Sequence, residues 1–209
     1  MFNIPPEQFW AFVLTYTIIE LTPGPNMAFL AVISASKGRR YGYATTLGIA
    51  LGLSIIGLAA AAGLAGIVAN SPLLFQSLRI AGVLYLLYLA WESWQEANEI
   101  SPGKVDTPQP LHRYFRHGLL VNILNPKAAV FYIAVLPTFL NPSDNIAQQA
   151  VFLTLVSVGI ATLIHMVIVS LTGVFQPILE DPVLNKRVRR GLAIVLAIIA
   201  LWFGWSVRG

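Results

Sequence analysis

The sequence contains no cysteine and few charged residues. Without cysteine, the chain can form no disulfide, no thiolate metal site and no thiol redox centre. Only 11% of its 209 residues are charged and 56% are hydrophobic, whereas a typical soluble domain is about 25% charged. The mean hydropathy of +0.72 agrees with this bias. These values exclude an ordinary soluble domain and indicate an integral membrane protein.

The net charge of +4 does not indicate a nucleic-acid-binding protein. The basic residues lie in short clusters between hydrophobic runs, where retention on the cytoplasmic side of a membrane explains them. The first ten residues, MFNIPPEQFW, lack the basic start of a cleavable signal peptide, so we expect the first hydrophobic segment to remain in the mature protein. We therefore expect a lipid bilayer, and no nucleic acid, as the partner.

Long apolar runs predict the fold class. A helix of about 20 apolar residues crosses a hydrocarbon core roughly 30 Å thick, and nothing in the sequence alternates as the strands of a membrane barrel do. The segments that are long enough are 9–34, 43–69, 73–94, 115–140, 149–175 and 191–207. We therefore predict an all-α membrane protein with six transmembrane helices.

The loop charges predict the orientation and the domain organisation. Ten of the thirteen Lys and Arg residues lie in the first, third and fifth connections, so both termini should lie outside the cytoplasm. A polar stretch, 95–113, reads as a cytoplasmic linker between two three-helix repeats, 1–94 and 114–209. Because three crossings is an odd number, the two repeats must be inverted relative to each other. Inverted repeats with broken helices are typical of secondary transporters.

Helix-breaking residues lie deep inside the first and fourth segments. The first contains Pro23, Gly24 and Pro25, and the fourth contains Pro126. LTPGPNMAF (21–29) also aligns with LNPKAAVFY (124–132). Since proline lacks an N–H, we expect unpaired carbonyls upstream, which can be tolerated at that depth only where protein or a water-filled cavity surrounds them. Both breaks should therefore face the interior.

A pair of broken helices suits a zwitterion. Each break creates a helix N-terminus that favours an anion such as a carboxylate. The missing N–H groups should leave the carbonyls of Ile19, Leu21 and Asn122 free to accept from an ammonium group. The alternative is that the prolines only kink their helices.

Two charged side chains accompany the breaks. Glu20 and Lys127 lie ten or more residues inside their segments, where a charge costs about 2.5 to 3.5 kcal/mol. They form either a structural ion pair or a site in which Glu20 binds a substrate ammonium or a proton and Lys127 binds the carboxylate. The predicted substrate-binding residues are Glu20, Pro23, Gly24, Pro25, Asn26, Asn122, Asn125, Pro126 and Lys127.

Three further features leave alternatives open. Glu20 and His165 are candidates for proton coupling, although a lone histidine within a membrane can also be a hydrogen-bonded packing residue. Small residues at 48–52 permit close approach of helices, either inside the chain or in a homodimer. An intramembrane enzyme could be assembled from Ser54, His165 and Glu20.

The motifs LTPGPN (21–26) and LVNILNPKAAVFYIAVLPTFL (120–140) resemble those of the LysE/RhtB family of bacterial amino-acid exporters. The resemblance extends over essentially the whole chain. It implies a secondary transporter, not an enzyme, that exports amino acids or close derivatives across the inner membrane by proton antiport and alternating access, with no cofactor. The motif positions of this family correspond to residues 23–26 and 125–127 of this sequence.

The sequence leaves other kinds of transporter open. Metal export is the closest alternative, but three histidines, no cysteine and one mid-membrane carboxylate make a poor set of metal ligands. A passive channel would differ from a transporter in carrying a flux that is independent of a proton gradient.

Overall fold

The computed structural model describes residues 4–22, 24–63, 71–98, 109–141, 144–172 and 182–206. Within these ranges the chain is helical and contains no strand, which confirms the predicted all-α class. The helices are α1 (Pro6–Leu21), α2 (Pro25–Lys37), α3 (Arg39–Ala61), α5 (Pro72–Asn98), α6 (Leu111–Ile123), α7 (Pro126–Val130), α8 (Ile146–Thr172) and α9 (Pro182–Ser206). A π-helical turn, η1 (Phe131–Val135), and a 3-10 turn, η2 (Leu136–Phe139), extend α7.

Within the described ranges, two helices, α3 and α8, are long and apolar enough to cross a membrane on their own. Two bent pairs bring the number to as many as four: α1 with α2 at an angle of 57°, and α6 with the segment from α7 to η2 at 48°. The outer face of α3 carries Leu47, Leu51, Ile55 and Leu58, which are 42–62% exposed and lie on one side of the helix. Such a stripe would be costly in water, and it suits contact with lipid.

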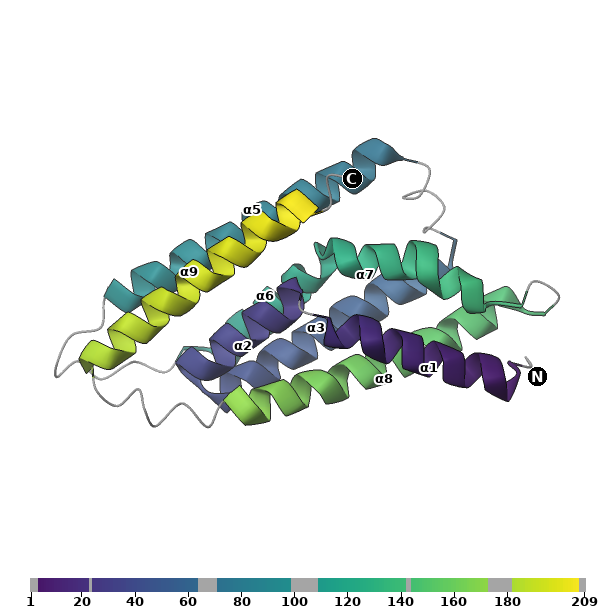
Figure 1. Ribbon diagram of the computed structural model, residues 1–209, viewed down its shortest axis with the longest axis horizontal. Helices are drawn as coiled ribbons and strands as arrows, with labels where there is room; N and C mark the ends of the chain where they lie inside the picture. The colour runs from purple at the N-terminus through teal and green to yellow at the C-terminus, as the bar shows by residue number, and fades with distance from the viewer. Residues whose placement is uncertain are drawn as a thin grey trace.

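The long helices form two groups (Figure 1). Helices α5 and α9 pack against each other along their length, while α3 lies between α6 and α8. The N-terminus lies at the end of the bundle where α8 begins and η2 ends, and α2 turns into α3 at the opposite end. Helices α1 and α8 therefore run side by side in the same direction.

Glycine allows α3 and α6 to approach closely. A Cβ atom built on Gly48 would lie 2.0 Å from the Phe115 carbonyl oxygen, and one on Gly118 would lie 2.2 Å from the Thr45 carbonyl oxygen. Gly52 faces the Asn122 side chain in the same way. Gly48 and Gly52 therefore serve packing within the chain.

Helices extend into both ends of the predicted linker, 95–113. Helix α5 continues to Asn98 and α6 begins at Leu111, while residues 99–108 lie outside the described part. An ion pair joins these two helices: Arg113 Nη2 lies 2.9 Å from Glu92 Oε1. The two helices that flank the predicted linker are thus in contact.

Candidate functional site at the two helix breaks

The first break separates α1 from α2. Helix α1 ends at Leu21, and Pro25 opens α2 as its first residue, where a missing N–H costs nothing. Gly24 precedes it in an extended conformation and offers no side chain to cap α2. The N–H groups at the start of α2 are therefore open to another partner. Pro23, a predicted site residue, lies outside the described residues.

The second break separates α6 from α7. Helix α6 ends at Ile123, and Pro126 opens α7 in the same position that Pro25 has in α2. Here the helix start is capped, because the Asn125 side-chain oxygen accepts a hydrogen bond of 3.0 Å from the Lys127 backbone N–H. Asn125 therefore stabilises the break from within its own half of the chain.

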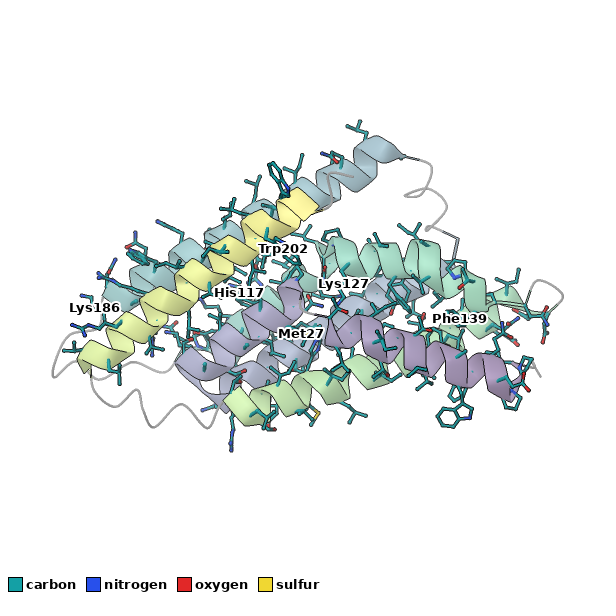
Figure 2. All side chains as sticks on the ribbon, viewed as in Figure 1. Met27, His117, Lys127, Phe139, Lys186 and Trp202 are labelled. Atoms are coloured by element: carbon teal, nitrogen blue, oxygen red, sulfur yellow. The ribbon has the colours of Figure 1, made fainter. Side chains whose placement is uncertain are left out.

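The two breaks meet, although they are about 100 residues apart in the sequence. Asn26 Nδ2 donates a hydrogen bond of 2.7 Å to Asn122 Oδ1. Lys127 Nζ donates one of 2.6 Å to the Thr22 carbonyl oxygen. Figure 2 shows Met27 and Lys127 together in the middle of the bundle, whereas Phe139 and Lys186 lie toward opposite ends. The structure thus brings the two predicted motifs to a common point.

The prediction that the carbonyls of Ile19 and Asn122 are left unpaired is wrong. The Ile19 carbonyl accepts a 3.1 Å hydrogen bond from the Thr22 N–H, and the Asn122 carbonyl accepts one of 3.0 Å from the Asn125 N–H. The chain tightens at each break, so a donor three residues along replaces the one that proline removes. The carbonyl presented to the other half is that of Thr22.

Glu20 pairs with the predicted proton-coupling histidine. The Glu20 carboxylate oxygen Oε1 lies 3.0 Å from His165 Nε2 on α8. The two atoms are close enough to form an ion pair when the imidazole is protonated. Their geometry does not meet the requirements of a hydrogen bond. Both side chains are buried, at 7% and 1% exposure. Lys127 lines the same cavity as Glu20, but its amino group donates to Thr22.

A cavity lies at the meeting point of the breaks. Its polar wall is formed by Tyr16, Glu20, Asn26, Asn125 and Lys127, together with the backbone of Gly24. Its apolar wall is formed by Ile19, Met27, Leu53, Ala128 and Phe131. A carboxylate, an ammonium and two amides on one side of an apolar wall can bind a small molecule that carries both charges and an uncharged part.

The cavity is too small for such a molecule in this conformation. Its volume is about 20 Å³, and about 10 to 15 Å³ is needed for one water. It can therefore hold one or two waters but not an amino acid. A ligand could enter only after the walls move apart.

Sequence reasoning did not single out the side chains of six of the residues that line this cavity: Tyr16, Ile19, Met27, Leu53, Ala128 and Phe131. Tyr16 lies four residues before Glu20, so both project from one face of α1, and this spacing could have revealed it. Phe131 packs on the Tyr16 ring with centroids 4.6 Å apart. No sequence signal could have indicated Phe131, because its place in the wall depends on the contact between α1 and η1.

The enzyme and metal alternatives gain no support from the described residues. The Ser54 hydroxyl donates a 2.8 Å hydrogen bond to the Ala50 carbonyl of its own helix. No group of three or more histidine, aspartate and glutamate side chains in the described part of the chain could hold a metal ion.

Comparison with known proteins identifies relatives of this chain. The chain is 31% identical to an uncharacterised membrane protein of Pseudomonas aeruginosa, over 96% of this chain and 94% of the relative. It is 32% identical to a homoserine/homoserine lactone efflux protein of Salmonella typhimurium, over 76% and 74%. It is 28% identical to a leucine efflux protein of Salmonella choleraesuis, over 80% of each chain. No solved structure gives a significant match.

The match to the family itself covers most of the chain and both breaks. The model of the LysE type translocators matches residues 17–207, a range that begins just before Glu20 and includes both motifs and His165. The protein therefore belongs to the family of LysE type translocators.

Proposed function

We propose that the protein exports amino acids or close derivatives from the cytoplasm, by proton antiport and alternating access. The convergence of the two helix breaks around Glu20 and Lys127 carries this proposal. Membership of the translocator family supports it, as do relatives named as leucine and homoserine efflux proteins. The substrate would be a small zwitterion, with protons as the coupling ion.

Each end of the zwitterion has a partner in the cavity. The substrate carboxylate would accept hydrogen bonds from Lys127 and from the open N-terminus of α2, at Gly24 and Asn26. The ammonium group would pair with Glu20. Lys127 must then release the Thr22 carbonyl, which would become a second acceptor for the ammonium. Substrate binding would thus replace a contact that now ties the two halves together.

Proton coupling follows from competition for Glu20. The carboxylate can hold the substrate ammonium or a proton, but not both. His165, 3.0 Å away, would accept or supply that proton. An antiporter must carry either the substrate or the proton across the membrane, one at a time. A carrier that crossed with both ligands, or with neither, would dissipate the proton gradient.

The small cavity supports alternating access. An amino acid does not fit into the space now present, so the walls must open toward one side at a time. We propose that six spans form two inverted three-helix repeats, 1–94 and 114–209, joined by the linker 95–113, and that the two halves rock about the breaks. Pro25 and Pro126 each open the second helix of a broken pair, which supports the repeat, although this match is two residues out of register with the sequence alignment of Pro23 on Pro126.

The orientation is open to a direct test. We propose that the protein spans the bacterial inner membrane with both termini outside the cytoplasm. Because the chain has no cysteine of its own, single cysteines report cleanly. Ser71→Cys in intact cells should react with a membrane-impermeant maleimide, whereas Lys37→Cys should react only after the cells are opened. The reverse pattern would overturn the orientation.

The transport function is tested in liposomes that contain the purified protein. Leucine and homoserine serve as test solutes, and counterflow of labelled solute against unlabelled solute inside is measured. Glu20→Gln should abolish counterflow, whereas Glu7→Gln, the same change at an exposed position of α1, should leave it intact. Undiminished counterflow in Glu20→Gln would remove Glu20 from the mechanism. Flux that does not depend on a proton gradient would indicate a channel instead.

A further inference from the structure

Helix α8 carries a line of buried polar side chains that substrate binding does not use. Thr154 and Ser157 are fully buried, and His165 is 1% exposed. At 1.5 Å per residue, Ser157 lies about 12 Å from His165 along α8, toward the end where α1 and α8 begin. Polar groups buried within a membrane are costly, so a line of them that runs away from the substrate cavity needs an explanation.

Two tyrosines connect this line to Glu20. Tyr132 of η1 shares a 3.1 Å hydrogen bond with the Ser157 hydroxyl. Tyr16 lies one helical turn from Glu20, and its hydroxyl lies close to both the Glu20 carboxylate and the Ser157 hydroxyl, without hydrogen-bond geometry to either. The side chains of Tyr132 and Thr154 both lie against Gly57 of α3. The order from the cavity outward is therefore Glu20, Tyr16, Ser157, Tyr132 and Thr154.

Two of these hydroxyls lack a hydrogen bond. Among the described residues, neither the Tyr16 hydroxyl, whose residue is 2% exposed, nor Thr154 Oγ1 has a partner. A buried hydroxyl without a hydrogen bond costs about 1 to 3 kcal/mol. A buried hydroxyl can avoid this cost by bonding to its own helix, as Ser34 does with the Leu30 carbonyl and Ser157 with the Thr154 carbonyl. The hydroxyls of Tyr16 and Thr154 can therefore each take a further hydrogen-bond partner, as a chain of proton transfers requires.

We propose that the hydroxyl groups of Tyr16, Ser157, Tyr132 and Thr154 form a proton path that leads from the Glu20–His165 pair toward the end of the bundle where α1 and α8 begin. The proposal rests on the proton antiport put forward above, and it names the route that the antiport requires. With the termini outside the cytoplasm, this end faces the side from which an exporter takes its protons.

Proton movement along this route needs no other reactant. A proton that arrives at the Thr154 oxygen displaces that hydroxyl's own proton to Tyr132, and Tyr132 passes its own proton to Ser157. Ser157 then passes its proton to Tyr16, which protonates the Glu20 carboxylate. Each oxygen gains one O–H bond and loses one, so the net result is one proton moved to Glu20 and nothing oxidised. The hydroxyls then rotate back to their starting positions.

The same geometry explains why the path does not leak. The Ser157 hydroxyl now donates to the Thr154 carbonyl at 2.8 Å, and Tyr16 is not aligned with either neighbour. The titratable groups around Glu20 are Tyr16 on its own helix, Lys127 on α7, Tyr132 on η1 and His165 on α8. Phe131 packs on Tyr16 and also lines the cavity, so a substrate that moves Phe131 would realign the Tyr16 hydroxyl.

The experiment compares two assays on the same liposomes. Accumulation of leucine or homoserine driven by a pH gradient requires net proton movement, whereas counterflow without a gradient does not. Ser157→Ala and Tyr132→Phe should lower gradient-driven accumulation roughly tenfold or more, by analogy with the loss of a proton-transferring group, and should leave counterflow within about twofold of the unmodified protein. Ser157→Thr keeps a hydroxyl and should restore accumulation.

Ser34→Ala is the matched control, since it removes a fully buried serine hydroxyl outside the path. It should change neither assay. Equal losses in both assays, or no loss in either, for Ser157→Ala and Tyr132→Phe would overturn the proton path. If the unmodified protein moved the test solutes without responding to a pH gradient, the path would be refuted while export would stand. If it moved neither solute nor any other amino acid, the proposed function itself would fail.

Discussion

The close crossing of α3 and α6 gives a prediction whose size follows from the structure. Gly48→Ala would place a methyl group 2.0 Å from the Phe115 carbonyl oxygen and 2.8 Å from the Leu119 nitrogen. Both are backbone atoms, so no side-chain rotation can relieve the clash, and the two helices must move apart by about 1 Å or more to restore van der Waals contact. The cost should fall at the upper end of the range for overpacking, about 3 kcal/mol.

This loss of stability can be measured as a fall in melting temperature. For a chain of this size 1 kcal/mol corresponds to roughly 2 to 4 °C, so Gly48→Ala should melt about 6 to 12 °C lower in detergent. Gly159→Ala on α8 is the control, because a Cβ there meets nothing within 4 Å. It should be neutral or slightly stabilising, since alanine favours helix over glycine by about 1 kcal/mol. Equal melting temperatures for the two variants would refute the packing argument.

Two further changes test the contacts between helices. Asn26→Ala removes the 2.7 Å hydrogen bond to Asn122, which is fully buried, so it should cost about 1 to 3 kcal/mol and slow counterflow; a melting temperature equal to that of the unmodified protein would argue against the bond. Glu92→Gln removes the ion pair with Arg113, but both side chains are about a quarter exposed. Solvent screening should limit this loss of stability to less than about 1 kcal/mol. A larger fall in melting temperature would show that the ion pair stabilises the fold more than its exposure predicts.

The sequence was sufficient to predict the helical class and the places of both breaks. Pro25 and Pro126 each open a helix, as a residue without an N–H does best at the first position. Depth within the apolar runs also indicated Glu20 and His165, because a charge or an imidazole there needs a partner. That they are each other's partner could not be predicted, since α1 and α8 are far apart in the sequence.

The turns at the two breaks and the contacts between helices decide which groups replace the hydrogen bonds that proline removes. The carbonyls of Ile19 and Asn122 looked free because proline removes the usual donor four residues along, but the tightened turn supplies another donor at each. The sequence predicted that Lys127 pairs with Glu20 or with a substrate, whereas its amino group donates a hydrogen bond to the Thr22 carbonyl. The sequence indicates which backbone groups lose their helical hydrogen-bond partner. The turn geometry and the packing of the helices determine which groups take its place.

The pairing of α1 with η1 lay beyond sequence reasoning for a similar reason. The π-helical turn Phe131–Val135 has no proline or glycine to mark it, although it lies next to the cavity. It places Phe131 against Tyr16 and Tyr132 against Ser157. The turn thus carries both a residue of the apolar wall and a residue of the proposed proton path.

The central claim is that a substrate binds where the two broken helices meet, and protection of a single thiol there tests it most directly. Because the chain has no cysteine, Met27→Cys introduces one reactive group into the cavity wall, and Thr138→Cys introduces one at the exposed end of η2. Labelling with a water-soluble maleimide is followed in liposomes with and without saturating leucine or homoserine. The account predicts that the transported solute slows labelling at position 27 several-fold and leaves position 138 unchanged. Equal labelling rates at position 27 with and without a solute that the protein demonstrably transports would contradict it.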